Sequence, residues 1–153
     1  KEGCLMKVVV QRVSQASVSI DKRVRGAIGK GFLILFGAAK DDTDEDLEYI
    51  VKKVTSLRIF EDSDGKMNLS LKDVGGELLV ISQFTLFADT KKGNRPSFIQ
   101  AGLPEPSKAF YLRFIQRCRE SGFRTEEGEF GADMDVSLTN QGPVTIIIDS
   151  KNR

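Results

Sequence analysis

Apolar and polar residues alternate through the first third of the chain with the two-residue period of a β-strand. Strands are predicted over 7–13, 16–20, 23–28 and 32–36. Val8 and Val10 share one face of the first strand, and Asp21-Lys22 supplies a two-residue turn between the second and the third. The fourth strand is apolar on both faces, which is typical of a strand in the centre of a sheet.

Two stretches repeat their apolar residues with the 3.6-residue period of a helix. The first opens after Thr43, a suitable N-cap, within an acidic run that favours the positive end of the helix dipole. Its apolar stripe is formed by Leu47, Ile50, Val51, Val54 and Leu57. The second helix is predicted over 107–121, with Phe110, Phe114 and Cys118 on one face and Gly122 as the C-terminal cap.

The remaining periodic segments are again strand-like. Strands are predicted over 58–60, 78–88, 136–138 and 144–148. The order of elements predicts a single α+β domain over residues 6–150, with a curled, barrel-like and largely antiparallel sheet covered by two helices. Residues 1–5 are interpreted as an N-terminal extension or an expression remnant.

Composition restricts the chemistry that this domain can use. The net charge of +1 means that nucleic acid could be bound only by a local basic patch. The chain contains no histidine, which excludes a Ser-His-Asp triad, a Cys-His pair and any histidine-ligated metal. The two cysteines share no motif, and neither a secretion signal nor a membrane-length apolar run is visible. A cytoplasmic protein that makes no membrane contact is expected.

Two stretches of side chains are candidates for a functional site. In the predicted strand 78–88, alternation places Gln83 and Thr85 on one face, which suits either a site or ordinary cross-strand hydrogen bonding. Covalent catalysis by Ser82 or Thr85 is disfavoured, because no base lies nearby in the sequence. The long loop 89–106 offers either a solvated surface or a phosphate contact through Lys91, Lys92 and Arg95.

The third candidate is the Gly142-Pro143 pair. Pro143 cannot donate to a sheet ladder, so it ends one strand or opens the next. One interpretation is a connection between two antiparallel strands. The other is a backbone, in a cis peptide, that is presented to a ligand without a side chain. The residues alone leave both interpretations open.

Seven blocks of sequence occur in the order seen in one known family: residues 6–13, 58–60, 65–68, 82–86, 95–98, 134–138 and 140–145. Ser-Gln-Phe-Thr at 82–85 and Gly-Pro-Val-Thr at 142–145 are that family's signatures, and neither departs from the pattern. On these blocks, residues 6–148 resemble the D-aminoacyl-tRNA deacylase family, also called D-tyrosyl-tRNA deacylase. Residues 1–5 are not part of the family pattern.

The resemblance implies a cytoplasmic homodimer that hydrolyses the ester between a D-amino acid, or glycine, and the 3′-terminal adenosine of tRNA. It implies an adenosine and ester pocket lined by Ser82, Gln83, Phe84 and Thr85, with backbone N–H groups near Gln83 and Phe84 facing the ester oxygen. Further substrate-binding positions would be Arg12, Met134, Asn140, Gly142 and Pro143.

In the family the Gly-Pro peptide is cis, and each subunit inserts it into the active site of its partner. Arg12 would help to hold this motif, and the Gly142-Pro143 carbonyls would screen the α-carbon of the substrate. The terminal 2′-hydroxyl of tRNA assists the attacking water in the family. An enzyme of this kind requires neither a cofactor nor a histidine, since aligned donors stabilise the developing oxyanion.

Two other functions remain open on the sequence. A non-catalytic module that binds the end of an RNA would keep the same fold and the basic loop but would show no turnover. A metal-dependent hydrolase is poorly supported, because the chain offers no clustered set of ligands, and no metal is expected.

Overall fold

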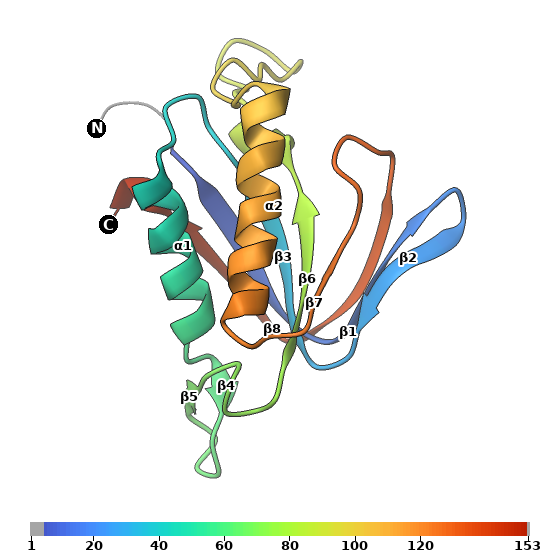
Figure 1. The fold of residues 1–153 in the computed structure, drawn as a ribbon, viewed down its shortest axis with the longest axis vertical. Coiled ribbons are helices and arrows are strands. Elements are labelled where there is room, and N and C mark those ends of the chain that lie inside the picture. The colour runs from blue at the N-terminus through green and yellow to red at the C-terminus, as the bar shows by residue number, and fades with distance from the viewer. Residues whose placement is uncertain (1–4, 153) are drawn as a thin grey trace.

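A long antiparallel strand pair runs through the molecule, formed by β1 (Lys7–Ile20) and β8 (Asp135–Asp149) (Figure 1). The computed structural model describes residues 5–152. Val8 and Val10 are fully buried, as their shared face predicts. The predicted strands 7–13 and 16–20 form one strand, because an irregularity near Ser14 shifts the register without ending the pairing.

The sheet has the order β2-β1-β3-β6-β7, and β8 pairs with β1 outside that path. The other strands are β2 (Arg23–Ile28), β3 (Gly31–Gly37), β6 (Glu77–Ser82) and β7 (Thr125–Glu127). All pairings of β1 are antiparallel, whereas β3–β6 and β6–β7 are parallel, because a crossover containing a helix joins each of these pairs. The predicted α+β class with a curled sheet is confirmed, and the sheet is mixed.

Strand β8 continues through the Gly142-Pro143 peptide, which is cis. Gln11 pairs with Thr145 and Val13 pairs with Asn140, so several residues of β8 bulge out opposite one residue of β1. The predicted connection between two strands is therefore wrong, since both halves pair with the same strand. The bulge accommodates the proline, which has no N–H for the ladder, and leaves it exposed.

The predicted strand 78–88 stops at Ser82, where β6 ends. Gln83 departs from strand geometry, with φ −145° and ψ 82°, and the 3₁₀ helix η1 (Phe84–Phe87) follows. The neighbouring strand β3 ends at Gly37, one residue after the partner of Ser82, so the ladder cannot continue. The backbone instead closes on itself, as the Leu86 N–H donates to the Gln83 carbonyl. The predicted strand faces of Gln83 and Thr85 are therefore wrong.

Two helices lie side by side over one face of the sheet, α1 (Asp44–Ser56) and α2 (Pro104–Glu120) (Figure 1). Thr43 and Asp46 form a capping box at the start of α1, which confirms the predicted N-cap. Helix α2 begins before the predicted residue 107, because Pro104 fits a first turn whose N–H groups have no helical acceptor. None of the helices in residues 5–152 is long and apolar enough to cross a membrane.

The main core lies between the helices and the sheet. Phe36 of β3 packs against Tyr111 and Phe114 of α2, with ring centroids 6.3 and 5.1 Å apart. At the surface, two ion pairs join the helices: Arg113 with Asp44 and Arg117 with Glu48.

The remaining elements lie at the margins of the core. The hairpin β4 (Phe60–Glu61) and β5 (Met67–Leu69) replaces the short strand predicted over 58–60, and η2 (Ser150–Asn152) follows β8. Most of the interpreted extension 1–5 lies outside the described residues, as does Cys4. Leu5, which is described, is buried with 2% of its surface exposed.

Candidate active site

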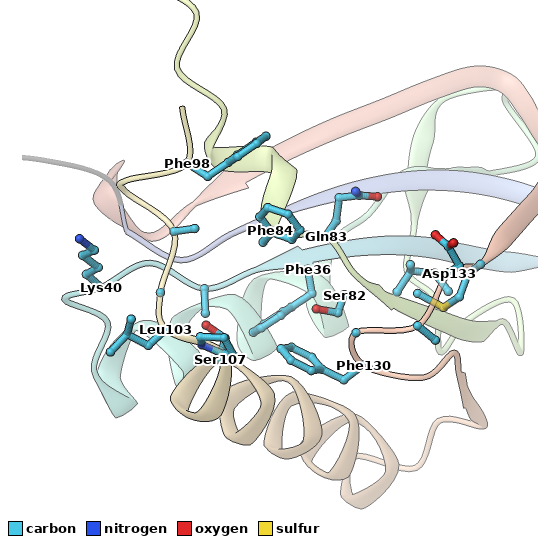
Figure 2. Close-up of a pocket in the computed structure, with 18 of the residues that line it drawn as sticks. Phe36, Lys40, Ser82, Gln83, Phe84, Phe98, Leu103, Ser107, Phe130 and Asp133 are labelled. Carbon is cyan, nitrogen blue, oxygen red and sulfur yellow. The ribbon is translucent and has the colours of Figure 1, made fainter. Parts of the chain in front are cut away.

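A cavity of about 840 Å³ opens beside the end of β6 (Figure 2). Four segments form it: the chain between β3 and α1, the turn after β6, the chain just before α2, and the chain between β7 and β8. Ser82, Gln83 and Phe84 lie along one side of the cavity, between Lys40 and Asp133 at its two ends (Figure 2). The sequence-predicted Ser-Gln-Phe block therefore lines a cavity large enough for a nucleoside.

The end of β6 leaves backbone donors unused. The Gln83 N–H donates to the Phe36 carbonyl at 2.8 Å, so this group is occupied within the fold. The N–H groups of Phe84 and Thr85 open the 3₁₀ helix, and the described residues offer them no backbone or side-chain acceptor. Of the two backbone N–H groups expected to face the ester oxygen, that of Gln83 is therefore occupied and that of Phe84 is free. The Thr85 N–H next to it is also free.

The hydroxyl groups of the signature block have no catalytic partner. The Gln83 side-chain amide donates to Thr85 Oγ1 at 2.5 Å, and Thr85 lies outside the cavity lining. Ser82 lines the cavity, but no lysine or carboxylate among the described residues hydrogen-bonds to it. This arrangement does not provide a nucleophile paired with a base.

The walls of the cavity are mostly apolar. Phe84 meets Phe98 edge to face, with ring centroids 5.0 Å apart and an interplanar angle of 72°. On the other side Met134 lines the cavity, as the resemblance implies, and its sulfur accepts from the Glu129 N–H at 3.5 Å. A Cβ added at Gly128 would lie 2.5 Å from this sulfur, so the glycine allows the methionine to approach.

Several lining residues were not found from the sequence: Lys40, Leu103, Ser107, Phe130 and Asp133. They lie on turns and at the start of α2, where no periodic pattern identifies a buried or site-facing position. Phe130 packs against Tyr111, with ring centroids 6.1 Å apart, and this contact ties the cavity wall to the core. Burial raises the pKa of Tyr111, whose hydroxyl donates to the Val80 carbonyl at 2.9 Å. Tyr111 is therefore a structural support and not an acid or base.

The Gly142-Pro143 peptide lies away from this cavity within the chain. It borders a separate depression of about 360 Å³ that contains Arg12, Phe60 and Glu61. Both residues of the peptide are exposed. Gly142 has φ +144°, and an added Cβ would lie 2.7 Å from a Val144 methyl carbon, so a side chain does not fit there. The sequence-predicted residues are thus divided between two places.

Two side chains hold the exposed peptide in position. Arg12 is buried, with 6% of the residue exposed, and its Nε and Nη1 donate to the carbonyls of Gln141 at 2.8 Å and Ile59 at 2.7 Å. Asn140 closes the base of the bulge, because its amide donates to the Val144 carbonyl and its oxygen accepts from the Val144 N–H at 2.7 Å. These contacts are with backbone, and the Asn140 amide also donates to the Thr145 hydroxyl oxygen at 3.1 Å. Together they fix the shape of the bulge.

The basic loop projects beyond the cavity. Lys91, Lys92 and Arg95 are exposed, and none of them has an ion-pair partner among residues 5–152. Pairing between Asp89 and Ser97 closes the loop at its base. The arginines of α2 differ, since Arg113 and Arg117 pair with carboxylates of α1. In the described part of the chain, no group of three or more Cys, Asp or Glu side chains is placed to hold a metal ion.

Comparison with known proteins gives consistent results. Residues 9–149 match the family model described as D-Tyr-tRNA(Tyr) deacylase. The chain is 58% identical to a D-aminoacyl-tRNA deacylase of Clostridium novyi (strain NT), with 95% of this chain and 98% of the relative covered. It is 54% identical to the D-aminoacyl-tRNA deacylase of Thermotoga petrophila, with 95% and 97% covered.

Two solved structures share the fold. One is named c-Myc DNA unwinding element binding protein. It is 41% identical to this chain with a TM-score of 0.87, and the match covers 94% of this chain and 97% of that protein. The other is described as a probable eukaryotic D-amino acid tRNA deacylase, with 22% identity and a TM-score of 0.80. The match covers 94% of this chain and 98% of that protein, and at this identity it shows a shared fold. By its matched length and its identity to curated relatives, the chain belongs to the D-Tyr-tRNA(Tyr) deacylase family.

Proposed function

We propose that this protein hydrolyses the ester bond between a D-amino acid and the 3′-terminal adenosine of tRNA, releasing the D-amino acid and tRNA and so proofreading chirality for translation. The observation that carries the proposal is the unused Phe84 N–H at the edge of a nucleoside-sized cavity. The relatives named D-aminoacyl-tRNA deacylase supply the reaction class. The reaction takes place in the cytoplasm, where charged tRNA is present.

Backbone donors stabilise the transition state in this mechanism. Attack on an ester carbonyl places negative charge on its oxygen, and a fixed N–H aimed at that oxygen lowers the barrier. Phe84 N–H is the principal donor, with Thr85 N–H beside it, because Gln83 N–H is already bonded to Phe36. An aminoacyl ester is activated, so the reaction needs neither a metal nor a cofactor. The 2′-hydroxyl of the terminal adenosine positions and activates the attacking water.

A second subunit completes the site. Gly142 and Pro143 are exposed, lie outside their own subunit's cavity, and are rigidly held by Arg12 and Asn140. A group built in this way is suited to enter the cavity of a two-fold related partner. On the same strand Ile147 is 69% exposed, and a partner subunit would cover this large apolar side chain.

Chirality follows from the inserted backbone. The carbonyl oxygens of Gly142 and Pro143 would stand next to the α-carbon of the substrate, on the side where an L side chain would point. A rigid backbone cannot move aside for that side chain, so the L ester is excluded and the D ester fits. Glycine has no side chain, so glycyl-tRNA is also a substrate.

The basic loop supplies affinity for the tRNA body. Lys91, Lys92 and Arg95 are exposed without acidic partners among the described residues, so they are available to phosphates. The net charge of +1 gives little long-range attraction, and a local patch has to provide it.

A second candidate function is nucleic-acid binding without turnover. The solved structure at 41% identity carries the name of a DNA-binding protein, which favours this alternative. It accounts for the basic loop, but it assigns no purpose to the free Phe84 N–H or to the clamped Gly142-Pro143 peptide.

Hydrolysis of D-tyrosyl-tRNA and L-tyrosyl-tRNA, measured side by side with and without a chelator, separates these functions. The proposal predicts release of D-tyrosine only, at the same rate in both conditions. Binding of tRNA without release of either amino acid would support the second function. Release that stops with the chelator would indicate a metal-dependent hydrolase, and release of both enantiomers would contradict the chiral screen.

A further inference from the structure

Lys40, Phe84, Phe98 and Leu103 lie at one end of the cavity (Figure 2). Together with Ile99, which lines the cavity next to Phe98 in the chain, they are here called the mouth. We propose that the mouth binds the unpaired nucleotides that precede the terminal adenosine of the substrate, with Lys40 contacting a phosphodiester between them. This inference rests on the proposed function, and it extends the site from the reacting nucleotide to the strand that carries it.

Charge distinguishes this end of the cavity. Among residues 5–152, two charged side chains line the cavity, Lys40 and Asp133, and they lie at opposite ends (Figure 2). Lys40 is exposed and has no ion-pair partner in residues 5–152. The Lys40 end therefore attracts anions, whereas the Asp133 end repels them. A strand of RNA that enters the cavity would pass over Lys40.

The shape of the surface gives the strand a path. Lys40 and Leu103 also line a second hollow of about 360 Å³. The lysine therefore stands on the ridge between the cavity and this hollow. A single-stranded polynucleotide with one residue in the cavity needs a cation at such a ridge, because each nucleotide adds a phosphate about one base step away.

The backbone ties Lys40 to the loop that contains the other free cations. Ala39, its neighbour, pairs with Ala101, and the Gly102 N–H donates to the Ala38 carbonyl at 2.9 Å. Residue 101 follows the basic loop in the chain, so Lys40 is fixed against the segment that carries Lys91 and its neighbours. The turn that contains Lys40 is therefore attached to the segment that leads from the basic loop into α2.

The apolar side chains of the mouth are suited to bases. Phe84 is 57% exposed and Ile99 is 70% exposed, although large apolar side chains are usually buried. Phe98 holds the Phe84 ring at a fixed angle by its edge-to-face contact. An exposed ring held in this way offers a stacking face that tolerates any base. A surface that combines aromatic faces with an unpaired cation suits a polynucleotide ligand better than it suits an apolar protein segment.

Binding of non-hydrolysable analogues tests the proposal independently of turnover. The probes are 3′-amino-3′-deoxyadenosine carrying D-tyrosine in amide linkage, and the same nucleoside extended at its 5′ side to the trinucleotide CCA. Wild type is expected to bind the trinucleotide more tightly than the nucleoside. Lys40→Met should reduce affinity for the trinucleotide by about fivefold, the value of one exposed charge contact, and leave affinity for the nucleoside unchanged. Lys52→Met, an exposed lysine on α1, is the matched control.

A second pair of variants tests the mouth without removing the lysine. Ile99→Glu and Ile99→Gln have similar shapes and differ in charge. The proposal predicts that Ile99→Glu weakens trinucleotide binding more than Ile99→Gln, with equal nucleoside binding by both. Equal effects of Lys40→Met on both probes, or no effect on either, would overturn the proposal. Failure of wild type to bind the nucleoside would instead contradict the proposed function.

Discussion

The Nε of Arg12 donates to the carbonyl of Gln141 at 2.8 Å, across the widest irregularity in the β1–β8 pair. Gln141 immediately precedes the exposed Gly142-Pro143 peptide, so the position of that peptide depends on the side chain of a buried arginine. The same guanidinium donates to Ile59, which joins the bulge to the segment before β4. On the proposed function, Arg12 would act on the substrate through the backbone that it holds.

Arg12→Lys should destabilise the fold and the site together. Lysine has one nitrogen and cannot reach both carbonyls with the geometry of a guanidinium. One buried acceptor loses its donor, which costs about 1–3 kcal/mol in the free energy of unfolding. Urea unfolding measures this loss, with the exposed Arg23→Lys as control, where a change within about 0.5 kcal/mol is expected. An unfolding free energy unchanged by Arg12→Lys would contradict the clamp.

Ser82→Ala and Thr85→Ala should both retain turnover. Neither hydroxyl is paired with a base, and a hydroxyl that only hydrogen-bonds to substrate contributes about 1 kcal/mol, or roughly fivefold in rate. Insertion of one alanine between Gln141 and Gly142 should be far more damaging, because it displaces the chiral screen. Single-turnover hydrolysis of D-tyrosyl-tRNA measures all three variants. An acyl-enzyme trapped on either hydroxyl would overturn the backbone mechanism.

Asp133→Asn tests whether the protein supplies a general base. In the described part of the chain, Asp133 is the one carboxylate that lines the cavity, so it is the side chain most able to compete with the substrate hydroxyl for this role. Loss of a general base would lower kcat by about 10²–10⁴-fold. The backbone mechanism predicts a change of less than about tenfold and the same pH profile as wild type. If the Asp133→Asn variant lost the acidic limb from its profile of kcat against pH, Asp133 would be the general base.

The thiol of Cys118 should be unreactive in the folded protein. Burial in the core raises its pKa to about 12, so the thiolate that attacks alkylating reagents is suppressed. In a Cys4→Ser background, iodoacetamide at pH 8 should modify Cys118 only after addition of denaturant. The unfolded state loses this proton near pH 9 and the folded state near 12, so stability falls as pH rises between these values. Rapid alkylation of native protein would contradict this burial.

The secondary structure could be predicted from the sequence more completely than the residues of the candidate site. Thr43 and the apolar stripe after it were sufficient to place α1, because caps and helical periodicity are local signals. The strand ending at Ser82 was missed, since alternation continues through the block and the end is set by the neighbouring strand β3. The cavity residues Lys40, Phe130 and Asp133 come from turns brought together by the fold, where sequence carries no periodic signal.

On the proposed function, each active site would combine the cavity of one subunit with the Gly142-Pro143 peptide of the other. Two inactive variants test it: Ala132→Trp, which fills the cavity, and a one-residue insertion before Gly142, which displaces the peptide. Random mixing of subunits makes half of the dimers mixed, and each mixed dimer has one intact site. Recovery of about a quarter of wild-type D-tyrosyl-tRNA hydrolysis is therefore expected. A mixture that stays as inactive as its parents would show that each subunit uses its own peptide.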